Sequence, residues 1–223
     1  MSNIRKTALV TGETYHVFTR SIAGFEVFRS DKSFGRFIQT MDYYNNSSPR
    51  LRLSDYLELS PEARQKTDNF REHNPLVQIF AYCLMPTHTH IALKQIQDGG
   101  ISTYMSNVLN SFSRYFNTAH KRRGPLWESK FKNVLVDTDD QLLHLTRYIH
   151  LNPSSAGLVS KPEEWQYSSY HEYVSINPTE NVCNLEGVLD INPTEYRRFV
   201  NNRIAYQRGL SKIKQLLIDN YTG

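Results

Sequence analysis

Residues 86–90 (PTHTH) form the segment of this chain whose residue types and spacing most directly suggest chemistry. On a β-strand, residues two apart project to the same face, so His88 and His90 would lie together on one side of a sheet. Two neutral imidazoles placed in this way can hold a divalent metal ion. The alternative is a pair of strand histidines that hydrogen-bond to their neighbours, because a His-x-His pair alone is a short pattern.

A second group of candidate residues lies on a predicted helix that Thr138 or Asp139 caps and that ends at Pro153. Tyr148 and Asn152 are four residues apart, so they share one face of this helix. Asn152 offers a carbonyl oxygen, which suits Mg²⁺ or Mn²⁺, and Tyr148 offers a phenol one turn away. The alternative is that Tyr148 packs in the core and Asn152 caps the end of the helix.

The hydrophobic pattern predicts the elements that must position these residues. Alternating or continuous apolar residues indicate strands, and apolar residues at helical spacing indicate helices. The predicted strands are 15–21, 76–85, 87–95 and 131–136, and the predicted helices are 30–45, 55–59, 61–70, 101–120, 138–153, 194–206 and 210–221. Hairpins interleaved with helices predict an α+β fold with an antiparallel sheet. We expect the helices to cover one face of this sheet and to leave the other face, or one end, free for a ligand.

Length, charge and cysteine usage set broad limits on the class of protein. At 223 residues the chain fits one domain with an extension, or two small domains. Lysine plus arginine exceed aspartate plus glutamate by 26 − 22 = 4, which permits a polyanionic partner without requiring one. Cys83 and Cys183 form neither a disulfide framework nor a zinc motif. With no apolar run of signal-peptide or membrane-spanning length, we expect a cytoplasmic protein without a membrane partner.

Three ordered segments resemble the single-tyrosine HUH transposases. They are 81–90 (AYCLMPTHTH), 124–132 (GPLWESKFK) and 147–159 (RYIHLNPSSAGLV), and the resemblance covers roughly residues 15–173. The REP-associated tyrosine transposases are the branch that these segments resemble most. Thr87 stands where the family often has Asn, and Thr89 stands where it usually has a bulky apolar residue, although a β-branched side chain can still pack there.

The resemblance implies a fold, a metal site and a nucleophile. The fold would be a ferredoxin-like or RRM-like HUH core over residues 1–174, followed by a basic helical extension over residues 175–223. His88, His90 and Asn152 would bind one divalent metal ion, Mg²⁺ or Mn²⁺. Tyr148 would be the nucleophile.

The implied activity is nicking and strand transfer of single-stranded DNA through a covalent 5′-phosphotyrosine intermediate, at repeat hairpins, as in DNA transposition. One alternative is a host-adopted protein of the same fold that binds hairpin DNA without transposing. Another is a zinc hydrolase, which would need a third His or carboxylate ligand in place of Asn152. With one catalytic tyrosine per chain, cleaving and rejoining two sites needs either a homodimer or sequential use of one active site.

The phenol of Tyr148 must lose its proton as it attacks, because a free phenol has a pKa of about 10. A bound metal ion could lower this pKa, or a nearby imidazole could accept the proton. His150 and His144 are the candidates on the same helix, and the sequence leaves these alternatives open.

Basic residues outside these motifs are candidates for contact with a phosphate backbone. The candidates for DNA binding are Lys121, Arg122, Arg123, Lys130, Lys132 and Arg147, and the alternative for the first three is an ordinary solvated turn. The predicted helices of the extension are also basic, through Arg197, Arg198, Arg203, Arg208, Lys212 and Lys214. We hypothesise that the extension helps to bind hairpin DNA, and the competing interpretation is a helical lid that completes the fold.

Overall fold

The computed structural model describes residues 8–46, 51–69, 74–175, 182–185 and 192–210, and its centre is a four-stranded antiparallel sheet. The strands are β1 (Thr14–Arg20), β2 (Val77–Met85), β3 (His88–Gln95) and β4 (Lys132–Val136), arranged in the order β2-β3-β1-β4. Pro86 lies in the turn between β2 and β3. The α+β fold that the sequence predicts is confirmed.

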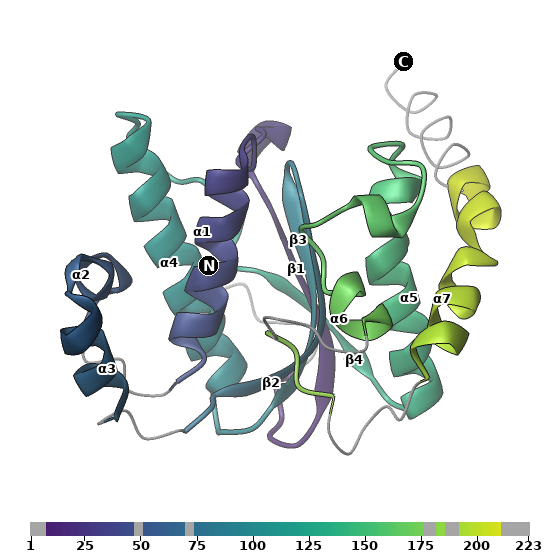
Figure 1. Cartoon of the computed structure of the whole chain (residues 1–223), viewed down its shortest axis with the longest axis horizontal. Coiled ribbons are helices and arrows are strands. Elements are labelled where there is room, and N and C mark those ends of the chain that lie inside the picture. The colour runs from purple at the N-terminus through teal and green to yellow at the C-terminus, as the bar shows by residue number, and fades with distance from the viewer. Residues whose placement is uncertain (1–7, 47–50, 70–73, 176–181, 186–191, 211–223) are drawn as a thin grey trace.

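Helices α1 (Asp31–Tyr44) and α4 (Gly100–Ala119) cover one face of the sheet (Figure 1). Their apolar sides bury Phe37 and Phe112 against Val17 of β1 and Ile91 of β3. The short helices α2 (Leu53–Glu58) and α3 (Pro61–Asn69) lie beyond α4 on the same side. A short 3₁₀ turn, η1 (Ile22–Gly24), follows β1.

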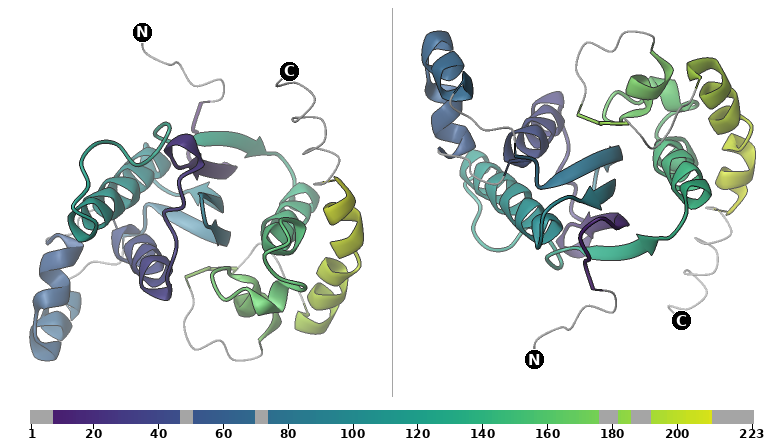
Figure 2. Two further views of the ribbon diagram at one scale, coloured as in Figure 1. Left: turned by 90° about the horizontal axis from the view of Figure 1, so that it is seen from above. Right: turned by 90° about the horizontal axis from the view of Figure 1, so that it is seen from below.

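Helices α5 (Asp139–Ser155), α6 (Tyr170–Val174) and α7 (Pro193–Asn201) lie on the opposite side of the sheet, as Figure 2 shows from two directions. They enclose a second apolar core, and η2 (Pro162–Glu164) lies between α5 and α6. The expectation of helices on a single face is therefore wrong. The ligand pocket described below lies beside α5 instead of on an uncovered face.

Side chains alternate between the two faces of each strand, and this alternation distributes them between the two cores. On β2, a bulge between Ile79 and Ala81 inserts one extra residue, Phe80, into the pairing with β3. Because side chains alternate along a strand, this insertion reverses the faces that later residues occupy. Ile79 and Leu84 consequently share the α1–α4 core, whereas Cys83 faces the second core.

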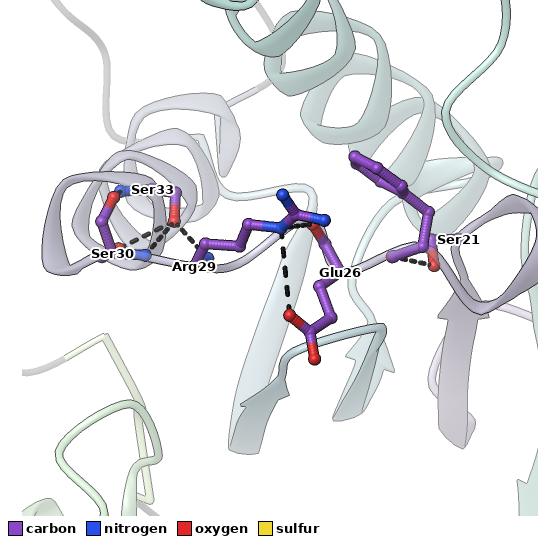
Figure 3. Close-up of polar contacts among 6 residues, drawn as sticks. Ser21, Glu26, Arg29, Ser30 and Ser33 are labelled. Atoms are coloured by element: carbon purple, nitrogen blue, oxygen red, sulfur yellow. Dashed lines mark hydrogen bonds and ion pairs between the residues drawn. The ribbon is translucent and has the colours of Figure 1, made fainter.

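The start of α1 shows why this helix begins where the sequence predicts. Ser30 is the N-cap, and its side chain and that of Ser33 bond to each other's backbone amides in a capping box (Figure 3). Arg29 donates its backbone N–H to the Ser33 hydroxyl, and its guanidinium lies 3.9 Å from the Glu26 carboxylate. The Ser21 hydroxyl bonds to the carbonyl of Phe25 and so orders the loop that enters the helix.

The end of α5 differs from the prediction. The helix passes through Pro153 and ends at Ser155, where we expected it to end at Pro153. A proline within a helix lacks the N–H that would bond to the carbonyl four residues earlier, here that of Ile149. The side-chain amide of Asn152 donates to this carbonyl instead, at 3.4 Å, and this contact compensates for the missing donor.

The predicted extension is described only in part. Within residues 192–210, Tyr196 and Val200 of α7 belong to the second core, and the Arg208 guanidinium donates to the carbonyls of Ser154 and Val159 near the end of α5. Lys212, Lys214 and most of the predicted helix 210–221 lie outside the described residues. The boundary between residues 1–174 and 175–223 stays a prediction. Among the described residues, no helix is long and apolar enough to cross a membrane.

Candidate active site

His88 and His90 lie on the same face of β3, as the spacing predicts. Their ring centroids are 5.1 Å apart and the ring planes are nearly perpendicular. His90 is buried, with 9% of its surface exposed, and His88 is half-buried. Thr89, between them, is fully buried and its side chain points to the opposite face, where the related family usually has an apolar residue.

A third histidine, His16 of β1, lies beside this pair, and the sequence reasoning missed it. Its Nε2 atom is 2.9 Å from Nδ1 of His90, and the two rings stack with centroids 5.1 Å apart. The alternation of residues 15–21 indicates that His16 and Phe18 share one face. That face could be related to His90 only once the pairing of β1 with β3 was known.

Hydrogen bonds occupy the same nitrogen, Nδ1, of both strand histidines. Nδ1 of His88 lies 2.9 Å from the hydroxyl of Thr87, and Nδ1 of His90 bonds to His16. In the described part of the chain, neither Nε2 atom has a hydrogen-bond partner. Histidines that bind metals characteristically donate their second ring N–H to a carboxylate, a backbone carbonyl or water, which sets the tautomer. Here a hydroxyl and an imidazole nitrogen take the place of these acceptors. The two Nε2 atoms therefore fit the role of ligands.

Burial keeps these imidazoles neutral. It lowers the pKa of His16 to about 4. It lowers the pKa of His88 to about 4 as well, with a further contribution from the positive charge of Arg20. The pKa of His90 falls well below its usual value for the same reason, burial being the largest cause. Neutral imidazole is the form that binds a metal ion, so the electrostatics of the site suit this role.

Helix α5 brings Tyr148 and Asn152 to the three histidines. The ring centroid of Tyr148 lies 5.7 Å from that of His90 and 6.0 Å from that of His16, with edge-to-face geometry in both pairs. Tyr148 is 36% exposed, so its phenol remains accessible from solvent. Burial of the rest of the ring raises its pKa above the usual value.

The amide of Asn152 is oriented by the proline that follows it. Its Nδ2 atom donates to the carbonyl of Ile149, which Pro153 leaves without a helical donor. The amide oxygen, Oδ1, is therefore the atom left for another ligand. Asn152 lines the same pocket as Tyr148 and the histidines.

The pocket that these residues line has a volume of about 360 Å³. Two cations, Arg20 at the end of β1 and Lys132 at the start of β4, and one carboxylate, Glu128, also line it. Lys132 is one of the predicted DNA-binding residues, whereas Arg20 and Glu128 were not singled out from the sequence. In the part of the chain that the structure describes, no group of three or more His, Cys, Asp or Glu side chains is arranged to hold a metal ion.

The other predicted basic residues lie at different places. Lys130 lines a neighbouring pocket of about 500 Å³. The guanidinium of Arg122 donates to Asn117 and to two backbone carbonyls of the turn that precedes β4. Lys121 and Arg123 belong to the same turn. Arg147 lies over the ring of Phe199, with Cζ 4.0 Å from its centroid, so it packs against α7 and does not line the pocket.

The two histidines considered as proton acceptors for Tyr148 point elsewhere. His150 is fully buried, with Nδ1 2.7 Å from the hydroxyl of Tyr196 and Nε2 2.8 Å from that of Ser169. Burial lowers its pKa to about 3. His144 contacts Arg147 and lies against the ring of Phe199. Neither ring lines the pocket, so the structure does not support either as the base.

The region of the chain that carries the candidate site is similar to known proteins. Residues 58–152 match the family described as IS200-like transposases. A protein of Haemophilus influenzae, named provisionally as a REP-associated tyrosine transposase, is 28% identical over 132 residues, which are 55% of this chain and 73% of that protein. Over these residues the chain is similar to the IS200-like transposases. The resemblance inferred from the sequence segments is thus confirmed.

The transposase-like fold also has a counterpart among solved structures. A REP-associated tyrosine transposase bound to a REP hairpin aligns over 86% of this chain and 99% of its own, with a TM-score of 0.52 and 16% sequence identity. This likeness shows a shared fold. The family match ends at Asn152 and includes His88, His90 and Tyr148, whereas His16 lies outside it.

Proposed function

We propose that this transposase relative nicks single-stranded DNA with Tyr148 as the nucleophile and transfers the cut strand to a second 3′ end. One observation carries the proposal: the phenol of Tyr148 and the imidazoles of His88 and His90 line one pocket, although they come from segments about 60 residues apart. A phenol placed beside a candidate metal site, and still reachable from solvent, is the arrangement that attack on a phosphodiester requires.

The donor atoms present fit a divalent ion. His88 and His90 would contribute their Nε2 atoms, and Asn152 would contribute its amide oxygen. A mixed nitrogen and oxygen set of this kind leaves positions for phosphate oxygens. When bound, Mg²⁺ or Mn²⁺ would supply positive charge beside the scissile phosphate and so stabilise the charge that develops in the transition state.

In the proposed reaction, the Tyr148 oxygen forms a bond to phosphorus while the bond from phosphorus to the 3′ oxygen breaks. The products are a 5′-phosphotyrosine link and a 3′-hydroxyl, which takes up a proton. Because the phosphodiester bond energy is kept in the link, a 3′-hydroxyl from another strand can reverse the step there. Attack requires the phenolate, and the raised pKa of Tyr148 opposes its formation. Arg20 and Lys132, which line the pocket, would stabilise both phenolate and phosphate.

We further propose that the substrate is a single strand beside a repeat hairpin. The solved relative is bound to a REP hairpin, and its fold is shared by this chain. A pocket of about 360 Å³ has room for one phosphate with its neighbouring sugar, which favours a strand that is not held in a duplex. Lys132 at the pocket and Lys130 beside it would contact the flanking phosphates.

The test is formation of a covalent protein–DNA adduct. Purified protein is incubated with end-labelled single-stranded repeat hairpins and Mg²⁺ or Mn²⁺, and the products are separated by denaturing gel electrophoresis. We expect an adduct that is lost with EDTA and lost in Tyr148→Phe. Tyr167→Phe, at a partly exposed ring outside the pocket, is the matched control and should form the adduct normally. Tight hairpin binding without any adduct would favour the alternative of a DNA-binding protein that does not transpose.

A further inference from the structure

A second basic site lies on the other side of the sheet from Tyr148. It is a groove of about 410 Å³ between α1 and α4, close to the start of α2. Three arginines line it, and each comes from a different part of the chain: Arg36 from α1, Arg52 from the residue before α2, and Arg114 from α4. Ser54, Ser111 and Thr118 also line the groove.

The charges of this groove are unbalanced. Its lining includes no carboxylate, and within the described residues none of the three arginines lies within ion-pair distance of an acidic group. Holding like charges at one site raises the free energy of the folded chain, and a bound anion would remove this cost. Three separate elements converge here, so the arrangement does not result from a local run of basic sequence.

The side chain of Arg36 gives independent evidence that the groove binds an anion. Its guanidinium lies over the ring of Tyr115, with Cζ 5.1 Å from the ring centroid, which holds the side chain in place. Its Nε–H is buried and, among the described residues, has no hydrogen-bond acceptor. A buried donor without an acceptor is costly, and an anionic oxygen is the acceptor that a guanidinium binds best.

The shape of the groove indicates an extended anion. Its lining runs from Ser111 to Ala119 on α4 and from Arg36 to Tyr44 on α1, a separation of eight residues in each case. At a rise of about 1.5 Å per residue, each side is about 12 Å long. One DNA strand carries a phosphate about every 3.4 Å along the helix axis, so the groove is long enough for about three consecutive phosphates.

We propose that this groove binds the phosphate backbone of DNA, as a second contact separate from the catalytic pocket. The inference rests on the proposed function only in taking DNA as the partner. Because α1 and α4 cover the face of the sheet opposite to α5, DNA held here lies away from the phosphate that Tyr148 attacks. Its contribution would be to affinity and not to cleavage chemistry.

The experiment measures binding and its dependence on salt. Fluorescence anisotropy gives the Kd of a labelled hairpin with single-stranded flanks over a series of NaCl concentrations, using Tyr148→Phe protein so that no covalent adduct forms. Arg114→Gln is the first variant, because this side chain is exposed and its loss should not disturb folding. Arg36→Gln is the second. Arg29→Gln is the matched control, because Arg29 is exposed, paired with Glu26 and outside the groove (Figure 3).

We expect Arg114→Gln and Arg36→Gln each to weaken DNA binding several-fold. Each should also reduce the slope of log K against the logarithm of salt concentration, by about 0.9 if the lost contact is to duplex DNA or about 0.7 if it is to a single strand. Arg114→Lys, which keeps the charge, should retain the wild-type slope. The proposal is overturned by an unchanged Kd and slope in both glutamine variants, or by an equal loss in Arg29→Gln. Adduct formation on a short single strand tests Tyr148 separately, so failure of one proposal is distinguishable from failure of the other.

Discussion

Nε2 of His16 lies 2.9 Å from Nδ1 of His90, and this contact joins strand β1 to the candidate metal ligands of β3. It fixes which nitrogen of His90 remains for a ligand, as the Thr87 hydroxyl does for His88. The ring of Tyr148 packs edge-on against both His16 and His90. His16 therefore touches the two components that the proposed chemistry needs, although it need not bind the ion.

Replacing His16 should weaken metal binding without removing a ligand. Loss of a hydrogen-bond partner to a metal-binding histidine typically lowers affinity by about 10- to 100-fold. We expect His16→Ala to lower Mn²⁺ affinity by that order in isothermal titration calorimetry, and His16→Gln to recover part of it, because the amide oxygen can accept from Nδ1. A wild-type affinity in His16→Ala would show that His90 does not depend on this contact.

Asn152 and Pro153 form a second pair whose roles can be separated. Asn152→Ala should lower Mn²⁺ affinity, measured by electron paramagnetic resonance titration, because it removes the proposed oxygen ligand. Pro153→Ala restores an N–H that can bond to the carbonyl of Ile149 and so releases the Asn152 amide. We expect this variant to lower Mn²⁺ affinity while its thermal unfolding midpoint stays equal or rises. Unchanged affinity in Pro153→Ala would refute the orienting role.

The buried histidines should make the protein unstable in mild acid when no metal is added. The pKa is about 4 for His16 and His88 and about 3 for His150 in the folded chain, against about 6.5 when unfolded. Below pH 6.5 the unfolded chain therefore binds more protons than the folded one, and the free energy of unfolding falls as the pH is lowered towards 4.

Urea denaturation at several pH values in EDTA measures how steeply the free energy of unfolding falls with pH. Each buried histidine contributes up to about 1.4 kcal/mol per pH unit. His150→Gln removes one such group and lies outside the pocket, so we expect a shallower slope between about pH 6 and pH 4.5. A slope identical to that of the wild type would mean that His150 titrates normally in the folded protein.

One buried hydroxyl of α7 bonds to the helix that carries Tyr148. The phenol of Tyr196 is fully buried and bonds to Nδ1 of His150 at 2.7 Å and to the hydroxyl of Thr146 at 2.9 Å. Tyr196→Phe leaves Nδ1 of His150 buried and without a partner, while the Thr146 hydroxyl keeps its bond to the carbonyl of Leu143. This change should lower the free energy of unfolding by about 1–3 kcal/mol in urea denaturation. Tyr206→Phe, at an exposed ring, is the control and should change it little.

Substitution by alanine should change the stability of the protein in opposite directions at two helical glycines, Gly35 and Gly100. A Cβ atom at Gly100 would overlap the carbonyl oxygen of Leu76, which is backbone and cannot move easily, whereas nothing lies within 4 Å of a Cβ atom at Gly35. Gly100→Ala should therefore destabilise the protein by about 1–3 kcal/mol. Gly35→Ala, inside α1, should stabilise it by about 0.5–1 kcal/mol, because alanine favours the helix. Thermal and urea unfolding check both; destabilisation by Gly35→Ala would contradict this account.

Local periodicity explains how much of the fold was predictable. The four strands, the long helices 31–44 and 100–119, and the cap at Thr138 agree with the sequence pattern, because these features depend on residues only a few positions apart. Pro153 was one exception. Its effect on the helix depended on whether another donor reached the carbonyl of Ile149, and the Asn152 amide provides that donor.

The sequence by itself determined that His88 and His90 share one face of a strand and that Tyr148 and Asn152 share one face of a helix, since both follow from the repeat of the backbone. Only the tertiary structure decided that these faces meet, that His16 and Arg20 join them, and that His150 and Arg147 turn away towards α7. The physical reason is that strand order and helix docking are set by burial of apolar surface between segments distant in the chain, and no spacing within one segment encodes them.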